Sequence, residues 1–236
     1  GLEHVLRTTS EAAHVVTEPL RIGVPSAAAV SPRLQALVEA YERAHPASPV
    51  QFVALPFRDR FRPLRAGEVQ LMVSTLPLDQ PDLVTGPVLS REPRMLAVGR
   101  RHPLARRPTV DIEDLADHAI GELDIAAPAE LVNEMAPSHT PSGRRIPRVA
   151  VAAAEPSALI LAVARDKVVQ PVTSQFAAAY THPDVVYVPL AGVPPARSAL
   201  GLAQARPEPC AAGLPGAAGA PPTPPADTFP GPGRSH

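Results

Sequence analysis

The chain has 236 residues, a net charge of −1 at pH 7 and 45% hydrophobic residues, so it can bury a substantial core. The balanced charge excludes a strong general attraction to nucleic acid or to anionic membranes. No apolar run of about 18 residues occurs, which excludes a membrane-spanning helix. Cys210 is the single cysteine, so an internal disulfide is excluded. The N-terminus lacks the features of a signal peptide, and we expect a cytoplasmic protein.

Residues 1–17 place their apolar side chains on one helical face, and Pro19 ends the pattern. Such a helix must bury its apolar stripe against its own domain, against a partner helix or against a further domain. The sequence leaves these alternatives open.

The next stretch predicts a buried strand followed by a helix. Residues 20–24 form a short apolar run, and Pro25 ends it because proline has no N–H to donate. Ser31 and Pro32 are typical of a helix start, and apolar residues then recur with helical spacing to residue 45. Ligands in open α/β sheets bind beyond the carboxyl ends of strands, so residues 25–30 are the first candidate binding loop.

Residues 49–73 continue the alternation of strands and helices. We expect a strand over 49–55, a short helix over 57–65 capped by Gly67, and a strand over 69–73. Short connections between such elements predict parallel pairing. Residues 81–89 and 91–99 then supply two apolar runs with no helix between them, which indicates that the chain enters a second sheet.

The second half of the chain repeats the alternation after a basic loop (100–107) and an acidic short helix (111–117), whose charges we expect to neutralise each other. We predict strands over 119–123, 146–151 and 167–171, the last followed by residues 172–174 at its end. We predict helices over 128–135, over 155–165, and from beyond residue 174 to residue 180. Two late strands, 184–190 and 198–205, are placed to return to the first sheet. This pattern predicts an α/β fold with two lobes and a ligand cleft between them. Residues 207–236 hold nine prolines and five glycines, and we expect them to be disordered.

Common enzyme and metal-site motifs are missing from the sequence, so we predict neither catalysis nor a bound metal or cofactor. Polar side chains instead stand at the ends of predicted strands. They are Ser26, Arg58, Ser74, Thr75, Thr173 and Ser174. Hydroxyl groups facing one cleft suit a carboxylate or a polar metabolite, with Arg58 as charge partner. The alternative for each is a helix cap or a solvent-exposed side chain.

Five segments carry a resemblance to the effector-binding domain of LysR-type transcriptional regulators. They are residues 20–24, 64–71, 100–104, 111–116 and 184–190, in the family's order and spacing. The family usually has a Gly-x-Gly turn where Ala164-Arg165-Asp166 stands. The resemblance covers residues 20–206 and implies a fold similar to type 2 periplasmic binding proteins. It further implies a small-molecule effector in the cleft, and a homodimer or tetramer.

Carried over by position, the resemblance assigns effector contacts to both lobes. The implied residues are Ser26, Ala27, Phe57, Arg58, Thr75 and Thr173. Residues 1–18 resemble the end of the family's linker helix, and DNA would be bound only through a helix-turn-helix domain absent from this chain. We expect lobe I over 19–88 and 188–206, lobe II over 89–187, and a dimer contact through residues 31–43 and 128–135.

The resulting hypothesis is a ligand-sensing regulatory domain with no catalytic activity and no membrane contact. Two alternatives on the same fold remain: a solute-binding receptor and a small carboxylate-processing enzyme. The sequence does not identify the effector or the operator.

Overall fold

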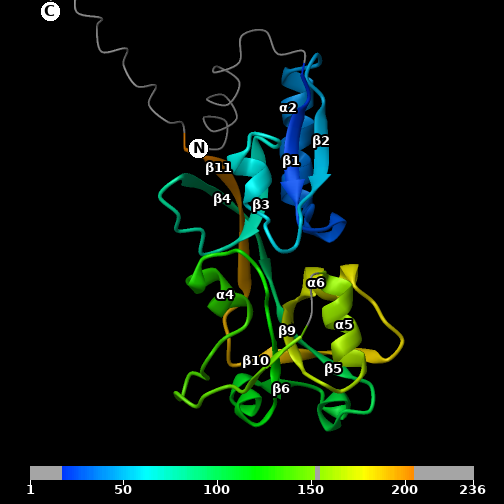
Figure 1. Ribbon diagram of the computed structural model, residues 1–236. Helices are drawn as coiled ribbons and strands as arrows, with labels where there is room; N and C mark the ends of the chain where they lie inside the picture. Colours follow the sequence, from blue (N-terminus) through cyan, green and yellow to red (C-terminus); the bar gives the residue numbers. More distant parts are fainter. Residues whose placement is uncertain (1–17, 152–154, 205–236) are drawn as a thin grey trace, which may run out of the picture. The chain divides into compact units, whose positions relative to one another are not determined.

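The computed structural model describes residues 18–151 and 155–204 (Figure 1). The predicted N-terminal helix and the predicted disordered tail lie outside the described residues. Among the described helices, none is both long and apolar enough to cross a lipid bilayer.

A five-stranded sheet contains the predicted opening strand, which lies second from one edge. Its strands, in spatial order, are β2 (Val50–Ala54), β1 (Leu20–Val24), β3 (Leu71–Thr75), β11 (Ala196–Ala203) and β4 (Leu83–Glu92). β1 pairs in parallel with β2 and β3, which confirms the predicted parallel pairing. β11 is antiparallel to both of its neighbours. The tips of β1, β2 and β3 therefore point to the same edge of the sheet.

Helix α2 (Pro32–Ala44) begins where the sequence predicts, because the Ser31 hydroxyl accepts a hydrogen bond from the Leu34 amide. Leu34 and Tyr41 of this helix are buried with Ile22, Val24 and other apolar residues of the first sheet. Helix α3 (Arg62–Arg65) covers only the end of the predicted helix 57–65. Gly67 follows it with φ +72°, the left-handed conformation expected of a helix-ending glycine.

A four-stranded sheet forms the second lobe. Its strands, in spatial order, are β6 (Val110–Asp111), β10 (Val185–Ala191), β5 (Arg94–Gly99) and β9 (Gln170–Thr173). β10 is antiparallel to β5, so the prediction that residues 184–190 return to the first sheet is wrong. The hydrophobic pattern of that segment shows a buried strand, but no sequence signal says which sheet it joins.

Smaller elements complete the segment between β5 and β10. They are the parallel pair β7 (Ile120–Glu122) and β8 (Arg148–Ala150), helices α4 (Ala129–Met135), α5 (Pro156–Ala164) and α6 (Ser174–Ala179), and 3-10 turns at Pro103–Arg106 and Ile112–Asp117. A further 3-10 turn, Ala27–Ala29, follows β1 in the first lobe. The predicted neutralisation of the basic loop by the acidic turn is confirmed for Arg107 and Asp114, which lie 2.7 Å apart.

Two connections carry the chain between the sheets, and they run next to each other. β4 passes into β5 after Glu92, and β10 passes into β11 before Ala196, which is paired with Glu92. The hydroxyl groups of Ser90 and Ser198 are hydrogen-bonded at 2.6 Å across this pair. The absence of a helix between β4 and β5 was therefore a correct indication of a change of sheet.

Helix α4 packs against the first lobe, although it lies within the segment predicted for the second. Its Leu131 is fully buried in a cluster that includes Phe61, Leu64 and Met72 of the first lobe. The Arg94 Nη2 donates a hydrogen bond of 2.9 Å to the carbonyl oxygen of Glu134 and also pairs with its carboxylate. α4 thus holds the first lobe's core and the start of β5 together.

This packing predicts that Leu131→Ala destabilises the protein far more than Leu161→Ala. Leu131 is 0% exposed, whereas Leu161, on the outer side of α5, is 51% exposed. Urea unfolding followed by circular dichroism should show a loss of about 2–5 kcal/mol for the buried position. The exposed position should change by about 0.5 kcal/mol or less. Equal losses at the two positions would contradict the docking of α4.

Candidate functional site

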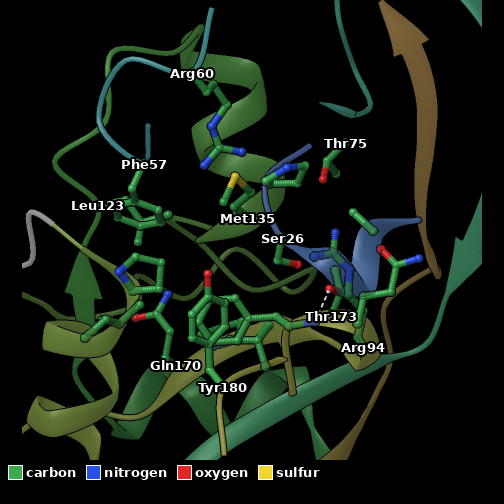
Figure 2. Close-up of a pocket in the computed structure, with 18 residues that line it drawn as sticks. Ser26, Phe57, Arg60, Thr75, Arg94, Leu123, Met135, Gln170, Thr173 and Tyr180 are labelled. Carbon is green, nitrogen blue, oxygen red and sulfur yellow. Dashed lines mark hydrogen bonds between the residues drawn. The ribbon is translucent and has the colours of Figure 1, made fainter. Parts of the chain in front are cut away.

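A cavity of about 120 Å³ lies where the strand tips of the first lobe face β9 and α6 of the second (Figure 2). The first lobe contributes Ser26 after β1, Phe57 and Arg60 after β2, and Thr75 at the end of β3. The cavity therefore occupies the place that the sequence predicts, beyond the carboxyl ends of the parallel strands. The second lobe contributes residues of β9, including Gln170 and Thr173, and Tyr180 after α6.

Four of the six predicted site residues line this cavity: Ser26, Phe57, Thr75 and Thr173. The Thr173 hydroxyl also accepts a hydrogen bond from the Phe176 amide at 3.2 Å, so it caps α6 as well as facing the cavity. Ser26 precedes the Ala27–Ala29 turn without capping it through its side chain.

The other two predicted residues lie outside the cavity lining. Ala27 is exposed on the 3-10 turn after β1. Arg58 forms an ion pair of 2.7 Å with Asp124, and both side chains are about 60% exposed. The structure thus places Arg58 outside the cavity lining with its guanidinium paired at the surface, which is the solvent-exposed alternative for this residue.

Arg60 takes the place that the sequence analysis gave to Arg58. It is 7% exposed, lines the cavity, and makes no ion pair or hydrogen bond through its side chain with any described residue. Its guanidinium lies 5.9 Å from the centre of the Phe57 ring, within the range of a cation–π contact. Burial lowers the pKa of this guanidinium from its usual value, with no carboxylate acting against the effect. Arginine nevertheless stays protonated at neutral pH.

Arg94 is the second cation in the cavity wall, and it differs from Arg60 because it has a partner. Its side chain is 7% exposed and bound to Glu134, whose side chain is 31% exposed. The Arg94 Nε is buried and has no hydrogen-bond partner. The positive charge of Arg94 is thus balanced within the protein.

Uncharged polar groups of the second lobe face Arg60 across the cavity. The Gln170 side-chain oxygen accepts a hydrogen bond from the Gly121 amide at 3.1 Å, which fixes the amide group of this fully buried side chain. In Figure 2, Gln170 and Tyr180 point toward the space that Arg60 enters from the opposite side. Burial raises the pKa of the Tyr180 hydroxyl, and the nearby Glu155 carboxylate raises it further, so this group is a neutral hydrogen-bond donor.

The lining as a whole is apolar with an excess of positive charge. Arg60 and Arg94 are its charged members, and no Asp or Glu is among the described residues that line it. Apolar side chains such as Leu123 and Met135 make up much of the remaining wall. Such a cavity favours a small molecule that combines negative charge with an apolar body. No cluster of three or more His, Cys, Asp or Glu suited to a metal ion occurs in the described part of the chain.

Sequence reasoning missed Arg60, Arg94, Gln170 and Tyr180. Residues 57–61 are not helical, because α3 begins only at Arg62, so no periodicity separates the inward Arg60 from the outward Arg58. The sequence signal that was available is the large apolar residue Phe61 next to Arg60. Phe61 is buried in the structure, and Arg60 lies on the same inward-facing segment. Arg94 stands at the start of β5 after the change of sheet, a place that the sequence analysis identified without assigning it a role.

Comparison with solved structures shows the same fold in two regulators. The effector-binding domain of BenM, solved with its effector benzoate, superposes with a TM-score of 0.58 at 18% identity, covering 81% of this chain and 86% of that one. A full-length BenM mutant gives 0.60 at 17% identity, covering 88% and 68%. The reduced OxyR regulatory domain from Pseudomonas aeruginosa gives 0.56 at 19% identity, covering 82% and 92%.

No curated protein sequence is significantly similar to this chain. The family described as the LysR substrate binding domain matches residues 13–212, which is most of the chain. The two sheets and the cavity at the strand tips agree with the two-lobed fold that the resemblance implied. The chain therefore belongs to the LysR substrate-binding domain family, the effector-binding domains of LysR-type transcriptional regulators.

Proposed function

We propose that this domain senses a small anionic or polar effector, which binds in the cavity between the two lobes. The observation that carries the proposal is the composition of the cavity wall, which contains two arginines and no carboxylate among the described residues. The BenM domain, solved with its effector benzoate, supports it, because an organic acid is the effector of a protein with the same fold. Ser26, Phe57, Thr75 and Thr173 are the predicted contacts that remain in this proposal, joined by Arg60.

The effector acts by shifting the population of lobe arrangements. Its binding surface is divided between Arg60 of the first lobe and Gln170 and Tyr180 of the second. A ligand that contacts both sides stabilises the arrangement in which both sets of groups are within reach. DNA binding then belongs to a helix-turn-helix domain outside these 236 residues, and catalysis has no part in the function. The cytoplasm remains the expected compartment.

A homodimer formed through α2 is the expected oligomer. Ala36 and Ala40 lie on the exposed side of this helix, where small side chains permit close approach of a second copy. The structure gives less support to a dimer contact through residues 128–135, because Leu131 of α4 is buried against this chain's own first lobe. The exposed Leu161 on α5 is a better candidate for the opposing apolar surface.

Filling the cavity should abolish effector binding without unfolding the domain. Ser26 lines the cavity and makes no side-chain hydrogen bond with a described residue, so Ser26→Leu adds volume and removes no bond. In a thermal-shift screen of small carboxylic acids, a saturating ligand should raise the wild-type melting temperature by about 5–10 °C. The shift should vanish in Ser26→Leu.

Ala27→Leu is the matched control, since it places the same side chain one residue away on an exposed position. This variant should respond like the wild type. A full shift in Ser26→Leu would show that the ligand binds elsewhere.

Charge at the centre of the α2 surface should weaken self-association. Ala40→Glu would place two carboxylates in a close helix contact of the dimer, and sedimentation equilibrium should show a dissociation constant raised by about tenfold or more. Ala129→Glu, on the exposed side of α4, should leave association unchanged. An unaltered dimer in Ala40→Glu would contradict the contact through α2.

A further inference from the structure

We propose that the effector is an organic monoanion with a ring-sized apolar body, whose single charged group pairs with Arg60. This inference rests on the proposed function, because it names the chemical class of ligand for the same cavity. It depends on one difference between the two arginines in the cavity wall. Arg94 is paired with Glu134, whereas Arg60 has no ion-pair partner among the described residues.

Arg60 provides one unbalanced positive charge inside the cavity. The residue is 7% exposed, and no described carboxylate or hydrogen-bond acceptor binds its side chain. A buried charge is costly unless it is paired, so an anion bound beside Arg60 would be stabilised. A carboxylate matches the guanidinium well, because its two oxygens can accept two parallel hydrogen bonds.

Arg94 limits the ligand to one negative charge. Its Nη2 is bound to both the carbonyl oxygen and the carboxylate of Glu134. The unpaired Nε is buried out of reach of a ligand. A second anionic group would have to displace Glu134, which would leave that carboxylate without its partner.

The rest of the cavity suits an apolar body. Phe57, Leu123 and Met135 form one side of it, as Figure 2 shows. The volume of about 120 Å³ is close to the ~150 Å³ of an engineered cavity that holds benzene. One ring carrying a carboxylate therefore fits both the size and the charge of the site.

Glu155 is the internal group that could compete for Arg60. It borders a smaller adjoining hollow together with Arg60 and Tyr180, but it is exposed and makes no ion pair with Arg60. If Glu155 balanced Arg60 in solution, Glu155→Gln would raise the affinity for an added monoanion markedly. Our proposal expects little change in this variant.

The test is isothermal titration calorimetry with benzoate, its neutral amide benzamide, and the dianion terephthalate, with cyclohexanecarboxylate as a non-aromatic monoanion. Wild-type protein and Arg58→Met should bind a monoanion alike, because Arg58 lies outside the cavity. In Arg60→Met the affinity for the monoanion should fall by about tenfold or more, which is the loss expected for one charge-assisted hydrogen-bonded pair. Benzamide should bind weakly, and with equal affinity, to the wild type and to Arg60→Met. Terephthalate should bind the wild type more weakly than benzoate and gain affinity in Glu134→Gln, where Arg94 is released.

The outcomes separate this inference from the proposed function. Equal binding of benzoate and benzamide, abolished by Ser26→Leu, would overturn the monoanion class and leave the effector cavity in place. Tighter binding of terephthalate than of benzoate by the wild type would overturn the limit to one charge. A third outcome is that neither benzoate nor cyclohexanecarboxylate binds, while another compound of the screen binds to the wild type and not to Ser26→Leu. This outcome would overturn the monoanion class and leave the effector cavity in place. Binding by no compound at all would overturn both.

A second measurement needs no ligand. Removing an unpaired buried charge relieves its desolvation, so Arg60→Met should raise the melting temperature of the ligand-free protein. Arg58→Met should leave it nearly unchanged. A lower melting temperature in Arg60→Met would show that Arg60 already has a stabilising partner, and would overturn the proposal.

Discussion

The pairing of β4 with β11 is the constraint on which the cavity depends. These strands carry the chain between the sheets, and their partnership at Glu92 and Ala196 keeps the two connections together. The Ser90–Ser198 hydrogen bond joins them at the same level. Because both connections lie close together, the tips of β1, β2 and β3 face β9 and α6, and the cavity forms between them. A chain with the same sheets and distant connections would have no such common opening.

Helix α4 adds a second link with different physics. Leu131 is held by apolar packing in the first lobe, whereas Glu134, one turn further on, is held by the guanidinium of Arg94 at the start of β5. Apolar burial is not directional, but a charged pair has a required geometry. Together they hold a short helix of seven residues in place beside the cavity. The same pair neutralises one of the two cations of the site, so a structural link also determines the charge left for a ligand.

Local patterns in the sequence were sufficient for much of the fold. The Ser31 cap, the Gly67 turn and the change of sheet after β4 each depend on neighbouring residues alone, and each was predicted correctly. The turn at Asp166 adopts φ +54° where the family usually has glycine, a conformation that aspartate tolerates better than most residues. The sheet that β10 joins depends on contacts between segments about 90 residues apart along the chain, and periodicity carries no such information.

The candidate site shows the same division between local and distant information. Strand ends are local features, and Ser26, Thr75 and Thr173 at such ends line the cavity. Their role as effector contacts stays a prediction. The choice between Arg58 and Arg60 depends on which side chain finds a carboxylate, and Asp124 comes from the other lobe. Once Arg58 is neutralised at the surface, the buried Arg60 has no described partner, and the ligand-free domain carries an unbalanced charge. An anion that balances it recovers free energy available only with the ligand in place. Contacts of that ligand with the second lobe would couple this gain to the lobe arrangement, as the response of a regulator requires.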